Sequence, residues 1–469
     1  MTPAAAVSDS NDMTTGMTAT ERRATSALAS IYALRMLGLF LILPVFSTYA
    51  LDNLSGATPA LIGIAIGAYG LSQAVLQIPF GMLSDRFGRK PIIIIGLLIF
   101  ALGSVVAAMS DSISGVIIGR VLQGAGAIAA AVMALVADLT REEQRTKAMA
   151  TIGITIGMSF AFALIAGPIL NSWIGVQGIF WATAVLALGG IAVLKLWVPQ
   201  PVRSRFHRDT QAVPGKFKDI FADPQLMRLN TGIMALHAIL IASFVVLPLA
   251  LRDHAGLASD HHWQVYLPVL LLGMLAMVPF IILAEKKRLM KQVFVGSIVV
   301  LGLSEVALLL ANQSVLGIGF ALFLFFAAFN TLEASLPSLI SKAAPTDSKG
   351  TAMGVYSTAQ FLGAFIGGSA GGWLYGAYGI ESVFGFCALV AGLWTVLALG
   401  MKTPRYLRSH MVNVGTVGPE QARHLAARLM QVPGVVEAVV IVEDGIAYLK
   451  VDSKLLDDKA LGEFSVARA

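Results

Sequence analysis

Residues 77–95 read Gln-Ile-Pro-Phe-Gly-Met-Leu-Ser-Asp-Arg-Phe-Gly-Arg-Lys-Pro-Ile-Ile-Ile-Ile, which is a dense group of charges between two apolar runs. The runs, residues 59–80 and 91–110, are each long enough to cross a hydrocarbon core ~30 Å thick as a helix that rises ~1.5 Å per residue. The charged stretch therefore predicts a short loop between two membrane-spanning helices. Its basic residues Arg86, Arg89 and Lys90 place that loop on the cytoplasmic side.

The composition predicts a polytopic membrane protein. The chain has 469 residues, of which 57% are hydrophobic and 13% charged, and its mean hydropathy is +0.78. That is more apolar surface than a soluble core can bury. The net charge of +6 comes from basic residues scattered through short loops, which is a topology signal and excludes a nucleic-acid-binding stripe.

Cysteine and metal chemistry are not expected. The one cysteine, Cys387, lies inside an apolar run, so the chain has no intrachain disulfide and no cysteine cluster for a metal. The simplest interpretation of Cys387 is a small buried hydrophobic residue. We expect no metal site and no cofactor.

The first half of the chain alternates spans with basic and non-basic loops. Residues 1–25 lack an apolar signal region and predict a disordered cytoplasmic tail. The spans of the first half, residues 26–198, are expected at 26–50, 59–80, 91–110, 114–138, 147–171 and 175–198. The loops after the second and fourth spans are basic, whereas the other loops hold no Lys or Arg. Both ends of this half are therefore cytoplasmic.

The second half repeats the first. A basic cytoplasmic linker at 199–226 precedes a second set of spans, expected at 227–251, 263–284, 289–311, 315–341, 350–376 and 381–401, in a half that ends near residue 402. Asp85-Arg86 is matched by Glu285-Lys286 at the same relative place, as in transporters with parallel repeats. The second copy carries Arg288 where Gly88 stands in the first. We expect its charges to preserve topology without a switching role.

Residues 403–469 predict a small soluble domain. A strand at 411–415, an amphipathic helix at 418–431, a hairpin at 435–451 and a closing helix from about Leu456 follow the order of a ferredoxin-like fold. The loop at 415–418 has no cysteine pair for a soft metal. Because basic residues follow the last span, we expect a regulatory or stabilising module on the cytoplasmic face.

Several motifs resemble those of the major facilitator superfamily. Gly81-x-x-x-Asp85-Arg86-x-Gly88-Arg89-Lys90 closely resembles the signature loop between its second and third helices. Arg120-x-x-Gln123-Gly124 is similar to its fourth-span motif, and Gly167-Pro168 to the centre of its antiporter motif, with Asn171 and Ser172 in place of the usual glycine pair. The resemblance implies an all-α fold of twelve transmembrane helices in two six-helix halves, with the ferredoxin-like domain appended. It also implies a location in a bacterial inner membrane and alternating access of the drug:proton antiporter type.

The signature loop implies a conformational switch. We expect Asp85 to act as a latch at the membrane edge, in contact with Arg89, Asp138 and the first turn of the eleventh span near Gly350, and not as a substrate ligand. The switch residues are Gly81, Asp85, Arg86, Gly88, Arg89, Lys90 and Asp138.

Ionisable residues within spans are the candidates for proton coupling, because a charge at the bilayer centre costs about 2.5 kcal/mol or more. The candidates are Arg35, Arg120, His237 and Glu333, with Glu333 preferred; Glu305 is expected to be structural. A cation such as Arg35 or Arg120 is expected to face Glu333 across the cavity. The alternative is that Glu333 only braces helices, and that His237 is simply hydrogen-bonded to a neighbour. The candidate cavity wall, for which ordinary packing is the alternative, comprises Tyr69, Gln73, Gln123, Asn330, Tyr356 and Gln360.

The leading functional hypothesis is a secondary active exporter of small amphipathic compounds, coupled to proton entry. The alternatives are a proton-coupled importer or facilitator of one metabolite, and a membrane sensor that works through the C-terminal domain. The sequence has no phosphate-binding loop for primary pumping and no constellation of catalytic residues, so we expect a transporter and not an enzyme. The expected partners are the lipid bilayer, a small-molecule substrate and protons, with the protein as a monomer.

Overall fold

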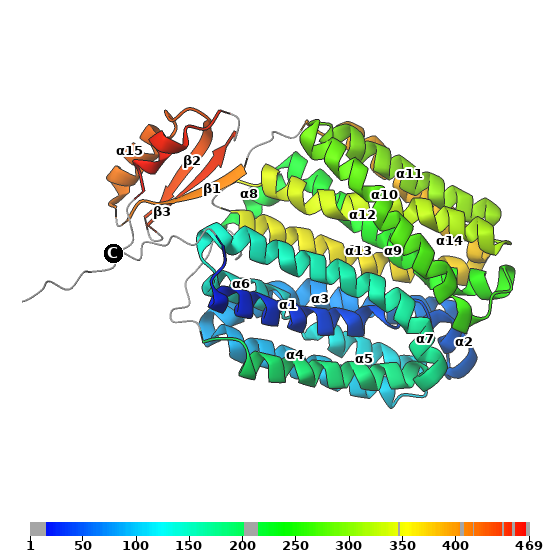
Figure 1. Ribbon diagram of the computed structural model, residues 1–469. Helices are drawn as coiled ribbons and strands as arrows, with labels where there is room; N and C mark the ends of the chain where they lie inside the picture. The colour runs from blue at the N-terminus through cyan, green and yellow to red at the C-terminus, as the bar shows by residue number, and fades with distance from the viewer. Residues whose placement is uncertain are drawn as a thin grey trace, which may run out of the picture.

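The computed structural model describes residues 16–200, 214–345, 348–403, 408–415, 417–442, 445–452 and 455–465. Residues 1–15 of the predicted tail and residues 201–213 of the predicted linker lie outside these ranges. Figure 1 shows two helical bundles side by side, with a small three-stranded domain beyond one end of them.

The first half consists of helices α1 to α7. The first span has two pieces, α1 (Ala19–Phe40) and α2 (Phe46–Asn53), separated by a turn that contains Pro44. Next come α3 (Pro59–Phe87), α4 (Arg89–Ala108), α5 (Ile113–Ala125) and α6 (Ala129–Leu139); the last two form one interrupted span. Helix α7 (Glu142–Leu196) holds the fifth and sixth spans, which meet at Gly175, where φ is 68°.

Two predictions for this half were wrong. Residues 19–25 are not a disordered tail, because α1 begins at Ala19 behind a capping box in which Thr18 and Glu21 bond each other's backbone N–H groups. The short loop predicted between the spans at 59–80 and 91–110 is also helical for nearly all of its length. Helix α3 continues to Phe87 and α4 begins at Arg89, so Gly88 alone separates them.

The second half begins within the predicted linker. A short helical segment, η1 (Pro214–Lys216) and α8 (Phe217–Ala222), precedes α9, whose Asp223 cap accepts hydrogen bonds from the N–H groups of Gln225 and Leu226. The elements that follow are α9 (Pro224–Leu249), η2 (Ala250–His254), η3 (Ser259–His261), α10 (Trp263–Lys286), α11 (Met290–Ala311), α12 (Val315–Ala343), α13 (Lys349–Tyr378) and α14 (Ile380–Leu399).

Twelve spans can be counted in the described part of the chain. Nine helical stretches are long and apolar enough to cross a membrane, and one of them, within α7, contains two spans. Helix α1 with α2, and the glycine-rich α13, supply the other two. The prediction of an all-α membrane fold with twelve helices is confirmed.

The two halves pack tightly at the end that the positive-inside rule assigns to the periplasm. A Cβ atom added to Gly63 of α3 would lie 2.1 Å from the carbonyl oxygen of Gly368 of α13, so the two backbones are in direct contact. At the same end, Arg252 Nη1 lies 2.7 Å from Asp52 Oδ2 across the halves. The structure is therefore closed toward the periplasm.

The C-terminal domain has the predicted order of elements. Strands β1 (Arg408–Asn413), β2 (Val435–Ile441) and β3 (Ile446–Val451) form an antiparallel sheet in the order β1-β3-β2. Helices α15 (Pro419–Leu429) and α16 (Asp458–Gly462) complete it, and Leu429, Leu449 and Leu461 are buried in its core. The ferredoxin-like arrangement is confirmed. Figure 1 places this domain at the end of the bundles where α8 lies.

Candidate functional site

The switch residues of the first half form one charge cluster. The Arg89 guanidinium donates to Asp85, to Ser84 Oγ at 2.9 Å and to Asp138 Oδ2 at 3.2 Å. Arg89 is 3% exposed and the Asp138 side chain is 0% exposed, so three helices are joined by a buried ionic contact. The structure thus brings Asp85, Arg89 and Asp138 together. The contact of Asp85 with the first turn of α13 stays a prediction.

The remaining switch residues lie around this cluster. Gly81 is inside α3, where an added Cβ would meet Ala130 at 3.0 Å, and Gly88 has φ 93° between the two helices. The Arg86 guanidinium lies 5.4 Å from the centre of the Phe87 ring. Lys90 Nζ donates to the Val198 carbonyl at 2.6 Å, which joins α4 to the end of α7.

A polar cluster within the first half contains two buried arginines. Arg35 is 0% exposed, donates to Gln73 Oε1 and lies 5.6 Å from the centre of the Tyr69 ring. Arg120 donates to Gln123 Oε1 at 2.8 Å and lies 5.3 Å from the same ring, and Gln123 in turn donates to Ser104. The cavity candidates of the first half are therefore ligands of the arginines.

A second polar cluster lies in the other half. Gln360 Nε2 donates to His237 Nε2 at 2.8 Å and to Glu333 Oε1 at 3.3 Å, so α9, α12 and α13 meet here. His237 Nδ1 lies 3.3 Å from the Ile233 carbonyl, so the consistent tautomer carries its proton on Nδ1 and is neutral. His237 Nε2 is 3.9 Å from Glu333 Oε2.

The predicted pairing of the arginines with Glu333 is not seen. Within the described residues, the basic side chain within 4.0 Å of Glu333 is the neutral imidazole of His237, from its own half, whereas Arg35 and Arg120 bind the glutamines and Tyr69 of theirs. The physical reason is that neutral acceptors and an aromatic ring of the same half lie within reach of each arginine, so neither has to cross between the halves.

Glu333 faces the boundary between the halves. Phe329, one helical turn earlier on α12, stacks on Phe160 of the first half with ring centres 6.1 Å apart, and it also lies 6.0 Å from the His237 ring. The Glu333 side chain is 37% exposed although it lies within a span, so water or a substrate can reach part of it, while its Oε2 atom is buried. Phe40 and Phe326 extend this aromatic contact around Phe160.

Both clusters carry buried polar atoms that have no hydrogen-bond partner within the described residues. Such atoms are costly unless water or a ligand satisfies them. In the first half they are Arg35 Nε and Nη1, Tyr69 Oη and Gln73 Nε2, and in the second they are Asn330 Nδ2, Glu333 Oε2 and Tyr356 Oη. These residues include most of the cavity candidates that the sequence predicts.

Two further predicted positions are structural in their contacts. Gly167 packs on the turn between α1 and α2, where an added Cβ would lie 2.5 Å from the Leu41 carbonyl, and Pro168 follows it inside α7. Glu305 is 0% exposed and accepts a hydrogen bond from Ser243 at 2.8 Å beside Cys387.

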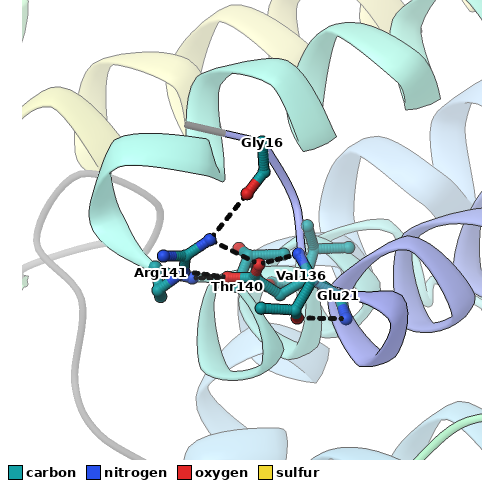
Figure 2. Close-up of polar contacts among 6 residues, drawn as sticks. Gly16, Glu21, Val136, Thr140 and Arg141 are labelled. Carbon is teal, nitrogen blue, oxygen red and sulfur yellow. Dashed lines mark hydrogen bonds and ion pairs between the residues drawn. The ribbon is translucent and has the colours of Figure 1, made fainter. Parts of the chain in front are cut away.

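The sequence interpretation missed one ionic contact at the cytoplasmic end of α1. Glu21 accepts hydrogen bonds from the Arg141 backbone N–H at 2.8 Å, from Nε at 3.0 Å and from Nη2 at 3.1 Å, and Arg141 also donates to the Gly16 carbonyl. Figure 2 shows Arg141 between Gly16 and Glu21, beside Thr140 at the end of α6. The signal was the Thr18-x-x-Glu21 capping pattern, which predicts a helix start.

The pKa of Glu21 reflects two opposing effects. Burial raises the pKa, but the hydrogen bonds from Arg141 and Thr18 together lower it by more. The pKa of Glu21 is therefore about 2, below its ordinary value of 4.5. Glu21 lies at the cytoplasmic end of α1, before the apolar stretch begins. Its carboxylate is therefore charged at neutral pH and fixes α1 to the loop that follows Asp138.

Comparisons with known proteins agree with this geometry. Residues 28–368 and 287–414 match the Major Facilitator Superfamily model, and residues 419–463 match the YajR YAM domain model. The inner membrane transport protein YajR of Escherichia coli (strain K12) is 50% identical over 94% of this chain and 96% of its own length.

A more distant relative and a solved structure are also similar to this chain. The multidrug resistance protein MdtH of Proteus mirabilis (strain HI4320) is 27% identical over 72% of this chain and 84% of its own. The crystal structure of a bacterial homologue of the human lysosomal transporter Spinster, in an inward-facing and occupied conformation, has a TM-score of 0.68 at 13% identity and covers 82% of this chain and 97% of that one. The chain therefore belongs to the major facilitator superfamily, as a multi-pass inner-membrane transporter with a C-terminal YAM domain.

Proposed function

We propose that this transporter exports small amphipathic compounds in exchange for protons, with Glu333 as the proton-coupling acid. The observation that supports this most is the position of Glu333, which is partly exposed at the boundary between the halves and contacts Gln360 and His237. A carboxyl group there can take a proton from one side and release it to the other when the halves change their packing. A multidrug resistance protein, MdtH, among the relatives supports export as the direction of transport.

The substrate class follows from the surface between the halves. Once the halves change their packing, Phe160 and Phe329 would supply apolar contact, and the unpartnered polar atoms of Asn330 and Tyr356 would supply hydrogen bonds. A compound with an apolar body and a few polar groups would satisfy both. We infer that the protein works as a monomer, since each half contributes its own cluster within one chain.

The test is Glu333→Gln in proteoliposomes, with an amphipathic dye such as ethidium that the unmodified protein transports. The Gln side chain keeps shape and hydrogen bonding but cannot titrate. We expect accumulation driven by a proton gradient to fall about tenfold or more, while dye exchange without a gradient survives; tenfold is ~1.4 kcal/mol of barrier.

The matched control is Glu305→Gln, the same chemical change in a span outside the aromatic contact. Normal gradient-driven accumulation by a folded Glu333→Gln protein would exclude Glu333 and move attention to His237. If the variant loses both dye exchange and gradient-driven accumulation, Glu333 takes part in substrate binding instead.

We also infer that residues 403–469 form a regulatory or stabilising module. The contact between Arg288 Nη2, in the turn after α10, and Asp452 Oδ1 of the C-terminal domain, at 3.9 Å, supports an attachment to the second half. Arg288 has φ 57°, which is uncommon for a residue with a side chain.

A further inference from the structure

A groove lies between the cytoplasmic ends of α4 and α7. It has a volume of about 350 Å³ and is lined by Lys90, Pro91, Ile94, Leu194, Lys195 and Gln200. Both helices are outer helices of the first half in Figure 1, where α4 and the end of α7 run along the edge of the bundle. The groove therefore opens on the outside of the protein, at the level where the membrane meets the cytoplasm.

The groove is basic. Lys90 is held across it by its hydrogen bond to the Val198 carbonyl, and Lys195 is exposed at its rim. Within the described residues, neither lysine has a carboxylate within 4.0 Å, so both charges are available to an anion. Arg23 Nη2 donates to the Leu196 carbonyl at 3.1 Å, which adds a third cation beside the groove. The α4 N-terminus contributes further partial positive charge.

An apolar surface continues from the groove toward the membrane interior. On α4, Ile95, Leu98 and Leu102 are 47%, 48% and 56% exposed at helical spacing on one face. On α7, Leu188 and Val185 are similarly 52% and 65% exposed. These faces are too apolar to contact water and are suited to acyl chains.

Exposed aromatic residues mark the depth of the groove. Trp197 is 53% exposed beside Lys195, and Phe87 is 59% exposed just before Gly88. Tryptophan at the end of a span is typical of the headgroup level of a bilayer. The basic and aromatic residues thus lie together at the cytoplasmic ends of these helices, and the apolar faces lie deeper, as the headgroup and the acyl chains of a phospholipid do.

We propose that this groove binds the headgroup of an anionic phospholipid. The lipid phosphate lies between the ammonium groups of Lys90 and Lys195, and the acyl chains lie along the exposed faces of α4 and α7. A soluble phosphate would use the lysines but would gain nothing from the apolar faces, so a lipid is the occupant that both parts of the site favour. A basic pocket between helices on the cytoplasmic side is suited to such recognition.

The test uses Lys195→Gln, because Lys195 is exposed and lies outside the switch. The full-length protein is placed in nanodiscs of phosphatidylcholine with a minor fraction of phosphatidylglycerol, and the lipid it retains in mild detergent is counted by native mass spectrometry. We expect retention of phosphatidylglycerol to fall about fivefold, in line with about 1 kcal/mol for each basic residue near the surface. Phosphatidylcholine retention should not change.

The matched control is Lys402→Gln, the same change after the last span of the second half, and Lys195→Arg should restore binding. Equal retention of phosphatidylglycerol by Lys195→Gln and Lys402→Gln would overturn the proposal. If inorganic phosphate displaces the lipid completely at equal concentration, the site is one for a free anion and the lipid assignment is wrong.

Discussion

The two copies of the charged motif lie at the same place in their halves, between the second and third helices, and differ in their chemistry. In the first, Arg89 joins Asp85 to Asp138 and is nearly fully buried. In the second, Glu285 pairs directly with Lys342 at 2.8 Å, and these side chains are 45% and 18% exposed. Both copies link the second helix of their half to the fourth. The comparison shows that an ionic link between two helices can be kept while its burial is lost. Its contribution to the free energy of unfolding then becomes small.

The turns between the helices differ in the same way. Gly88 has φ 93° and ψ 150°, a conformation that is essentially restricted to glycine. Arg288 has φ 57°, which a residue with a side chain can adopt at a cost of ~1–2 kcal/mol. The turn of the second copy therefore has a backbone conformation that an arginine can adopt. Arg288 in this turn contacts Asp452 of the C-terminal domain.

The largest effect is expected from removing the buried cation. Arg89→Gln breaks a buried ion pair by removing the cation that bonds Asp85 and the 0% exposed Asp138 side chain, and should lower the free energy of unfolding by ~3–5 kcal/mol. Lys342→Gln in the second copy should cost ~0–1 kcal/mol, since its pair is partly exposed. Thermal unfolding in detergent compares the two. Equal losses would mean that burial does not distinguish the copies.

Exchanging the turn residues tests the backbone difference. Gly88→Ala should destabilise the protein by ~1–3 kcal/mol because alanine does not tolerate this conformation. Arg288→Gly should stabilise it by ~1 kcal/mol, less the small contribution of the Asp452 contact. The same unfolding measurement serves for both variants. A stabilised Gly88→Ala protein would show that the turn relaxes freely.

Asp85 should separate transport from binding. We expect Asp85→Asn to reduce the transport rate about tenfold, ~1.4 kcal/mol of barrier, while substrate affinity stays nearly intact, because the residue lies at the membrane edge in the Arg89 cluster. Glu285→Gln, its counterpart, should transport normally. Binding titrations beside rate measurements provide the check, and an equal loss of affinity would place Asp85 in the binding site.

The smallest effect is a pH dependence at the cytoplasmic end of the first half. Because the pKa of Glu21 is about 2 in the folded protein and 4.5 ordinarily, its contribution to stability is complete above pH 4.5 and is lost as pH falls toward 2. Glu21→Gln should flatten the dependence of the melting temperature on pH in that interval. Glu285→Gln should not, and an unchanged slope in Glu21→Gln would disprove the assignment.

Hydropathy and loop charge were enough to predict the twelve spans, the two halves and the order of the C-terminal strands, because membrane thickness and strand alternation leave direct marks in a sequence. They could not show that α3 continues to Phe87, because hydropathy marks only the apolar part of a helix. The backbone hydrogen bonds of a helix can continue into polar sequence outside the membrane. Nor could they show that Glu21 is buried against Arg141, because that contact joins residues far apart in the chain.

The sequence was enough to predict which residues belong to the candidate site, but not which of them contact each other. Arg35, Arg120 and Glu333 are visible as charges in apolar runs, but which neighbour satisfies each depends on how the helices pack. The arginines found acceptors within their own half, in Gln73 and Gln123, and Glu333 found Gln360.

The contact of Gly63 with Gly368 has a consequence for how the transporter meets its surroundings. A seal made from two backbones contains no group that acid can protonate or an oxidant can modify at that contact. The pH and the oxidants of the periplasm vary with the external medium. The contact between Gly63 and Gly368 would not change with either. Only the charged residues can then respond to pH or to other ions. Most of them lie on the cytoplasmic side, where the cell controls the composition of the solution.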